Sequence, residues 1–268
     1  MKELLSLEWK KFKSNTVFRV LVAMYILLAP LIILMGKDIV DKMQIPMLTS
    51  TEIYEFPKIW DYQGYVGNWL VPFCLGFLTI YMITSEVGNK TMRQNILTGM
   101  TKKSFFLSKS LSILFIASAA TLLYALSTII IGVIHTDGID LALIFDNNFA
   151  IFKFFLLCLG YMSFAMLVAF IIRRGTLAIF FYFFYFILES ILQGIHVYYY
   201  THVSRNYWPI NSIEDLHPFP LLKIPDFFVD KEWNFSLLLS SGQAIMMSII
   251  YTTLFFAIAY RSFMKRDL

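Results

Sequence analysis

Residues of the types that do chemistry are sparse in this sequence, and their spacing matches no catalytic set. The four histidines are scattered, and there is neither a His-Glu-x-x-His pair for zinc-dependent hydrolysis nor a Gly-x-Ser-x-Gly elbow for acyl transfer. Asp38/Asp41 and Asp137/Asp140 have the spacing of acids that bind magnesium for phosphate-bearing substrates. Both pairs lie in turn or amphipathic sequence, which favours solvated carboxylates. No metal site is predicted, and an intramembrane enzyme is an alternative that no residue set supports.

One acid, Glu189, lies within a long apolar run. With 3.6 residues per helical turn, Tyr182, Gln193 and His196 share its helical face. A charge at mid-bilayer costs about 2.5–3.5 kcal/mol on insertion scales, so such a residue usually faces a cavity or a partner. We therefore expect this face to line a translocation path or a dimer seam. The alternatives are a protonated glutamate that is hydrogen-bonded between helices, and one that lies high enough to contact water.

The composition places these residues in a membrane protein. Of the 268 residues, 58% are hydrophobic and 15% are charged, and the mean hydropathy is +0.67. Soluble domains carry about 25% charged residues, so this chain cannot cover its surface with polar groups. A soluble enzyme, a disordered chain and a nucleic-acid-binding module are excluded, and the predicted fold class is an all-α polytopic membrane protein. Cys74 and Cys158 both lie within apolar runs, which excludes a disulfide framework.

Six runs are long and apolar enough to cross a hydrocarbon core of about 30 Å, which takes about 20 helical residues. The predicted spans are residues 17–35, 65–85, 108–134, 152–172, 176–198 and 238–260. An even number of spans places both termini on the same side of the membrane. The termini and the loops after the second and fourth spans hold 15 of the 22 basic residues, and basic residues favour the cytoplasmic side. Both termini are therefore predicted to be cytoplasmic.

Two segments outside the spans are amphipathic or rich in aromatic residues. Residues 3–16 are predicted to form an interfacial amphipathic helix with Leu5, Trp9 and Phe12 on its apolar face, and the alternative is a cytoplasmic extension of the first span. Residues 199–236 form a long outer loop that holds four of the eight prolines and many aromatic side chains. Since aromatic residues are enriched at the membrane–water boundary, we expect this loop to cap the outer mouth or to dip into the interface.

The loop after the second span, residues 86–109, has the clearest local pattern. A short helix is predicted at about 90–98, because its apolar residues are spaced i, i+4 and share one side. Gly99 suits the left-handed position that ends a helix, and Thr101 can cap the helix that continues as the third span. We expect a short, rigid cytoplasmic helix between two tight turns, which could push on a soluble partner.

Seven features follow one another along this loop: Glu86, Lys90–Thr91, Ile96–Leu97, Gly99, Thr101–Lys102, Phe105–Phe106 and Lys109. This order of an acid, a basic–threonine step, an apolar pair, a turn residue, a threonine–lysine pair, a second apolar pair and a lysine resembles the permease subunits of ABC exporters of the ABC-2 type. The layout of the whole chain is also similar to that family, with an interfacial N-terminal helix, six spans, cytoplasmic ends and a long outer segment before the last span.

The resemblance implies that residues 1–268 form one transmembrane permease domain of a split exporter that moves a substrate outward. The permease would pair with a second copy or a paralogue in the bilayer, and ATP-binding cassette subunits would dock on the short cytoplasmic (coupling) helix. The residues implied in coupling are Glu86, Lys90, Thr91, Arg93, Ile96, Leu97, Gly99, Thr101 and Lys102. The sequence has no Gly-x4-Gly-Lys-Ser/Thr loop, so ATP and Mg²⁺ would belong to the partner, with no cofactor in this chain. A membrane scaffold or assembly subunit and an ATP-independent carrier or channel are the alternative functions.

Overall fold

The computed structural model describes residues 2–43, 53–200, 206–220 and 238–266, and the regular structure in these ranges is helical. The elements are α1 (Lys2–Phe12), α2 (Thr16–Met43), α3 (Ile59–Leu70), the π-helical segment η1 (Val71–Gly76), α4 (Phe77–Gly88), α5 (Thr91–Leu97), α6 (Lys102–His135), α7 (Leu141–Phe145), α8 (Phe149–Ile172), α9 (Gly175–Tyr200), α10 (Pro209–Glu214) and α12 (Ser241–Lys265).

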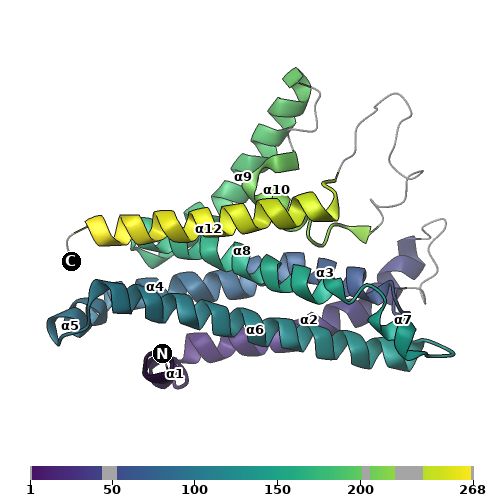
Figure 1. Cartoon of the computed structure of the whole chain (residues 1–268), viewed down its shortest axis with the longest axis horizontal. Coiled ribbons are helices and arrows are strands. Elements are labelled where there is room, and N and C mark those ends of the chain that lie inside the picture. Colours follow the sequence, from purple (N-terminus) through teal and green to yellow (C-terminus); the bar gives the residue numbers. More distant parts are fainter. Residues whose placement is uncertain (1, 44–52, 201–205, 221–237, 267–268) are drawn as a thin grey trace.

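Six helical segments within the described residues are long and apolar enough to cross a membrane: Thr16–Gly36, Ile59–Gly88, Lys102–His135, Leu141–Ile172, Gly175–His196 and Ser241–Lys265. The predicted all-α polytopic fold with six spans is confirmed. Figure 1 shows the long helices running side by side, with α9 leaving the bundle at an angle. Both termini and α5 lie toward one end of the bundle, which we call the terminus end, and α7 lies at the other.

The core of the molecule surrounds α8, which packs against α4, α6, α9, α12 and η1. This helix is apolar on every side, which is the pattern of a helix enclosed by protein. Small residues along it let its neighbours approach closely: a methyl group added at Gly160 would lie 2.9 Å from the side chain of Ile213. The helices that carry the candidate sites are therefore held against one central element.

The second span is not a single regular α-helix. α3, η1 and α4 follow one another over Ile59–Gly88, and the six residues around Pro72 are wound as π-helix. Because proline lacks a backbone N–H, a turn that contains it loses a hydrogen bond and widens or bends. The predicted span 65–85 is too short at both ends. The turns that the prediction left out carry Asp61 and Glu86. The spans were predicted from runs without charged residues, so turns with a charged side chain were not included.

Other helices also extend beyond their apolar runs. α2 continues past the predicted end of the first span and places Asp38 and Asp41 in a helix rather than a loop, although their side chains lie outside the described ones. α6 begins earlier than predicted, at Lys102, and α12 ends later, at Lys265. Hydropathy marks only the part of a helix that suits lipid, whereas the backbone ladder continues until a cap or a glycine ends it. The fourth and fifth predicted spans agree with α8 and α9 to within three residues.

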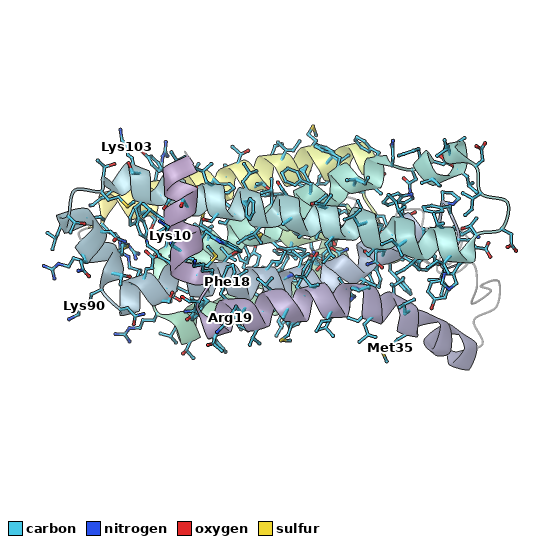
Figure 2. The ribbon with its side chains drawn as sticks, turned by 90° about the horizontal axis from the view of Figure 1, so that it is seen from below. Lys10, Phe18, Arg19, Met35, Lys90 and Lys103 are labelled. Carbon is cyan, nitrogen blue, oxygen red and sulfur yellow. The ribbon has the colours of Figure 1, made fainter. Side chains whose placement is uncertain are left out.

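The N-terminal helix α1 lies across the long helices near the terminus end, as the two views together show (Figures 1 and 2). Glu8 and Phe12 are buried against the bundle, whereas Trp9 is 56% exposed. Trp9 and Phe12 line one hollow beside α1, and the side chain of Leu5 lies outside the described ones, so the predicted interfacial face stays a prediction. The face that packs inward contains an acid, because a buried cation of α6 lies opposite it.

Part of the predicted outer loop 199–236 packs into the bundle. The structure describes residues 206–220 of it, and α10 in this segment contacts both α8 and α12. The Asn68 Nδ2 donates to the carbonyl oxygen of Glu214 at 2.9 Å, and the His217 ring lies 3.1 Å from the carbonyl oxygen of Ala150. These contacts hold α10 and the residues after it against the first half of the second span and the start of α8. The remaining residues of the predicted loop lie outside the described ones, and its capping of an outer mouth stays a prediction.

Candidate functional site

The short helix predicted after the second span is present as α5, and both of its ends are fixed by turns. At its start, Lys90 adopts a left-handed conformation (φ 58°), and the hydroxyl of Thr91 donates to the carbonyl oxygen of Glu86 at 3.2 Å. At its end, Gly99 has φ 111°. The Gly99 amide donates to the Ile96 carbonyl at 3.2 Å, and the amide of the residue after Gly99 donates to the Asn95 carbonyl at 3.0 Å. This pair of bonds is the Schellman arrangement, which favours glycine.

The next helix begins directly after this turn. The hydroxyl oxygen of Thr101 accepts the backbone N–H of Ser104 at 3.1 Å, as a capping residue does. The Nζ of Lys102 donates to the carbonyl oxygen of Arg266 at 2.9 Å, and the Arg266 guanidinium donates to the carbonyl oxygen of Ile171 at 2.5 Å. The start of α6, which follows α5 after one turn, is therefore tied to the chain after α12 and to the end of α8.

One side of α5 is left open at the terminus end. Met92 is buried and Ile96 is half-buried, so these two residues hold the helix against the bundle. Leu97 is 77% exposed, and Lys90 and Arg93 are exposed beside it. The predicted pair Ile96–Leu97 is thus divided, with one side chain facing inward and the other outward. The surface that α5 presents combines one large apolar side chain with two cations.

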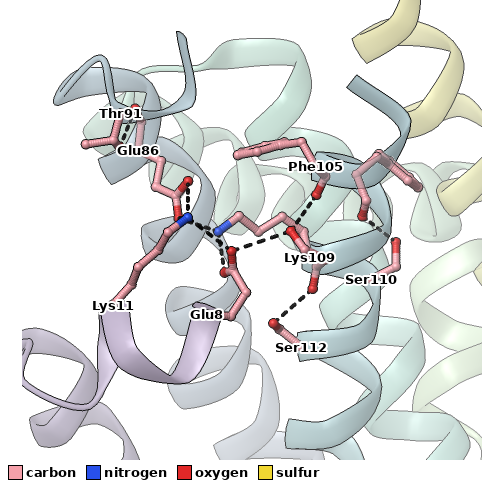
Figure 3. Close-up of polar contacts among 10 residues, drawn as sticks. Glu8, Lys11, Glu86, Thr91, Phe105, Lys109, Ser110 and Ser112 are labelled. Carbon is pink, nitrogen blue, oxygen red and sulfur yellow. Dashed lines mark hydrogen bonds and ion pairs between the residues drawn. The ribbon is translucent and has the colours of Figure 1, made fainter. Parts of the chain in front are cut away.

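Glu86 lies away from this exposed surface. Its carboxylate is buried in an ion cluster that consists of Glu8, Lys11, Glu86 and Lys109 (Figure 3). The Lys109 Nζ lies 2.5 Å from a carboxylate oxygen of Glu8 and 2.5 Å from one of Glu86. The Lys11 Nζ lies 3.3 Å from an oxygen of each of the same two acids. The ion cluster joins α1, α4 and α6 immediately beside the start of α5.

Charge balance explains why this cluster can be buried. Two carboxylates face two ammonium groups, so each ion has opposite charge next to it and the desolvation cost is offset. Lys109 is 1% exposed, and its ammonium also lies 5.0 Å from the ring centre of Phe12 and 5.3 Å from that of Phe105. The hydroxyl of Ser108 adds a 3.4 Å hydrogen bond to Glu8. The arrangement fixes the relative positions of three helices.

Sequence reasoning missed Glu8 and Lys11 as members of this site. The sequences of α1 and α6 each contain a charged residue that indicates a buried ion pair. Glu8 is one helical turn from Phe12 and interrupts the apolar face of α1 with an acid. Lys109 is a cation at the start of an otherwise uncharged run. An acid and a cation on faces expected to be buried predict that each has a partner, although they do not say which one.

The residues predicted to line a path are brought together only in part. Glu189 is 2% exposed, and its carboxylate oxygens accept the backbone N–H of Ile210 at 3.1 Å and of Asn211 at 2.8 Å. Gln193 donates to Glu189 at 3.4 Å. Glu189 therefore accepts from the first turn of α10 and joins two helices, as one of the predicted alternatives has it, while the protonation in that alternative stays a prediction.

The other two members of the predicted path lie in different surroundings. Tyr182 is fully buried between Phe164 and the backbone of Gly76, where a methyl group would meet its hydroxyl at 2.4 Å. His196 is half-buried, more than one turn beyond Glu189 along α9. Tyr182 and His196 thus differ from each other in burial, and a lining role for the set stays a prediction.

The acids that the sequence offers as metal ligands do not converge. Asp137 and Asp140 are exposed in the turn before α7. Within the part of the chain that the structure describes, no group of three histidine, cysteine or acidic side chains is placed to hold a metal ion.

One comparison with known families gives a match. A family model described as "ABC-2 family transporter protein" matches residues 4–189, from α1 to Glu189 in α9. The matched part contains α5 and all four members of the ion cluster, whereas α10 and α12 lie beyond it. No curated protein matches the chain.

Proposed function

This chain belongs to the ABC-2 family of transporter proteins, and on that premise we propose that it is the permease subunit of a split ABC exporter. In this proposal a separate polypeptide binds and hydrolyses ATP with Mg²⁺, and the movement that results opens a path outward through the spans. The proposal also includes a second permease, either a copy of this chain or a paralogue. The exposed apolar side chains of α9, which include Phe180, Phe184 and Ile191, offer a surface for it.

The observation that supports this function best is the shape of α5. An isolated seven-residue helix would not be stable in water, yet here it is fixed by a left-handed turn at one end and a Schellman turn at the other. Leu97 stands out from it beside two cations, which suits a partner that offers an apolar groove with acidic residues at its rim. A rigid projection of this kind can transmit force from a soluble subunit.

The ion cluster gives that force a route into the membrane. Glu86 is at the end of α4 and Lys109 is in the early turns of α6, so the cluster lies on both helices that flank α5. Glu8 and Lys11 add α1 to the same unit. A displacement of α5 would therefore move α4, α6 and α1 together, because separating them would leave buried charges without partners.

The charge distribution supports a cytoplasmic position for α5 and for both termini. Figure 2 shows Lys10, Lys90 and Lys103 at the terminus end, whereas Met35 lies near the opposite end of α2. Basic residues are retained on the cytoplasmic side of membrane proteins. We place the chain in the cytoplasmic membrane of a bacterium, where the terminus end would meet an ATP-binding subunit in solution.

A co-purification experiment with matched variants tests this function. The full chain is cross-linked in its native membrane, extracted in mild detergent, and compared with Leu97→Asp and Leu141→Asp. Both leucines are highly exposed (77% and 71%), but Leu141 is in α7 at the opposite end. We expect a stoichiometric partner with a phosphate-binding loop and ATPase activity to co-purify with the unmodified chain and with Leu141→Asp, but not with Leu97→Asp. A preparation without any ATP-binding partner after cross-linking would overturn the proposal in favour of a scaffold or an ATP-independent carrier.

A further inference from the structure

A cavity of about 830 Å³ opens between the second span, α9 and α10. One wall comes from α3 and η1, the second from the middle of α9, and the third from α10 and the residues that follow it. Figure 1 shows α10 beside α9, well away from α5. Cavities that bind drug-sized molecules have volumes of about 300–1,000 Å³, so this one is large enough for such a ligand.

Aromatic side chains form a large part of the cavity wall. Six of its lining residues carry aromatic rings: Tyr65, Trp69, Phe73, Phe183, Phe186 and Phe219. Some of these rings contact each other across elements, with centroids 4.8 Å apart for Phe73–Phe183 and 4.9 Å apart for Tyr65–Phe219. Aromatic faces carry partial negative charge and attract cations. The wall therefore suits a ligand that has both an apolar body and a positive charge.

The charged groups of the cavity have one sign. Glu214 and Asp215 line it, and none of its described lining residues is lysine, arginine or histidine. Glu189 lies close enough to affect the titration of Glu214. A cavity with only acidic ionisable groups disfavours anions and attracts cations.

Among these three acids, Glu214 is the one whose carboxylate is free to receive a ligand. Glu189 accepts two backbone N–H groups, and the Asp215 carboxylate accepts from the Asn211 side chain at 3.2 Å and from the Leu239 backbone N–H at 2.9 Å. The Glu214 carboxylate makes no hydrogen bond or ion pair with any residue that the structure describes, and it is exposed to the cavity.

We propose that this cavity, with Glu214 as its charged group, binds a monovalent organic cation that has an aromatic or alkyl body. The inference rests on the proposed function in one respect, because it makes such a cation the class of exported substrate. A lipid tail would use the apolar wall but would leave the carboxylate without a partner. Ca²⁺ and Mg²⁺ take six or more oxygen ligands, whereas the cavity offers one free carboxylate.

Binding of two probes with the same shape and opposite charge tests the inference. The purified full chain in detergent is titrated by equilibrium dialysis with tetraphenylphosphonium, a cation with four phenyl rings, and with tetraphenylborate, its anionic counterpart. We expect saturable binding of the cation that the anion does not displace. Glu214→Gln keeps the shape of the side chain and removes its charge, and it is expected to weaken cation binding at least tenfold.

Two further variants separate a specific loss from damage to the fold. Asp137→Asn removes an exposed acid far along the chain and is expected to leave binding unchanged. Trp69→Leu removes an aromatic face from the wall and is expected to weaken cation binding by a few fold. Each variant must elute as the unmodified chain does in size-exclusion chromatography. Equal binding of the two probes, or unchanged cation binding by Glu214→Gln, would overturn the proposal.

This experiment is independent of the ATP-binding partner. Binding is measured on the permease alone, so a failure here leaves the exporter assignment standing and removes only the substrate class. Conversely, if no ATP-binding partner exists, the probe still reports whether the cavity takes cations. If native mass spectrometry instead shows a co-purified phospholipid that tetraphenylphosphonium cannot displace, the cavity is a lipid site and the inference is wrong.

Discussion

The ion cluster and the cavity beside α10 both gather carboxylates near the membrane, but they treat charge in opposite ways. In the cluster, Lys109 lies 2.5 Å from both Glu8 and Glu86, and a second lysine completes a neutral set. The cavity is lined by Glu214 and Asp215 without a described cation, with Glu189 nearby, and the Glu214 carboxylate has no hydrogen-bonding partner among the described residues. Paired charge fixes helices in place, whereas unpaired charge is available to a ligand. In the two proposals made above, the first region transmits movement and the second binds a ligand.

The largest expected effect is a loss of stability when the ion cluster is changed. Lys109→Met leaves two buried carboxylates with only Lys11 nearby, so we expect a loss of about 3–5 kcal/mol in the free energy of unfolding. Lys103→Met is the matched control, because Lys103 is exposed six residues earlier in the same helix. Thermal unfolding in detergent measures both variants. Equal unfolding temperatures for the two would show that the cluster does not stabilise the fold.

The same removal of charge should have different consequences in the two regions. Glu86→Gln replaces a charged hydrogen-bond partner of a buried lysine and is expected to cost about 1.5–3 kcal/mol of stability. Glu214→Gln removes a charge without a described partner and is expected to change stability by less than about 0.5 kcal/mol. Chemical denaturation of the two variants checks this. If Glu214→Gln destabilised the chain as much as Glu86→Gln, the carboxylate of Glu214 would have a structural role.

The pH dependence of cation binding sharpens the comparison further. Desolvation by the surrounding residues raises the pKa of Glu214 to about 7, although its side chain is open to the cavity. The carboxylates of Glu189 on α9 and of Asp215, directly after α10, add to this rise. Tyr161 on α8 also interacts electrostatically with it. A carboxyl group is charged above its pKa and neutral below it.

Tetraphenylphosphonium affinity is therefore expected to rise about tenfold from pH 6 to pH 8, in proportion to the charged fraction of Glu214. Dialysis at several pH values measures this, and Glu214→Gln should give a flat profile. A rise that persists in Glu214→Gln would assign the titration to another group.

The smallest expected effect is at the turn that ends α5. Gly99→Ala places a side chain where φ is 111°, and we expect it to cost about 1 kcal/mol and to weaken partner binding. Gly88→Ala is the control, because a methyl group there meets nothing within 4 Å and no positive φ is required. Thermal unfolding and partner affinity are measured together. A loss of partner affinity in Gly88→Ala alone would contradict the role given to the Schellman turn.

The six spans and α5 could be predicted because short stretches of sequence determine them. Charge-free runs located the spans, and Gly99 with Thr101 located the turn between α5 and α6, because these signals lie within a few residues of the structure they cause. The ends of the spans were less predictable, since helices continue into polar sequence. The π-helical segment at Pro72 could not be predicted without knowing how the neighbouring helices pack against it.

The contacts within the candidate sites could not be predicted, because they join distant parts of the chain. Glu8 and Lys109 are about one hundred residues apart, and nothing local in α1 indicates α6 as its partner. Glu189 was recognised as exceptional, but its role in holding the first turn of α10 depends on a segment some twenty residues further on. Glu214 attracted no attention in the sequence, because its isolation is a property of the folded surroundings.

The most direct test of the central claim is site-specific cross-linking from α5. Cys74 and Cys158 are both buried, so a thiol introduced by Leu97→Cys or by Leu141→Cys would be the one accessible to a reagent in its respective variant. Each variant is treated in native membranes with a short bifunctional thiol–amine reagent. The exporter account predicts that Leu97→Cys, and not Leu141→Cys, is joined to an ATP-binding subunit, with a yield that changes when ATP is added. No cross-link from Leu97→Cys to any ATP-binding protein, in membranes where the reagent demonstrably labels that thiol, would contradict the account.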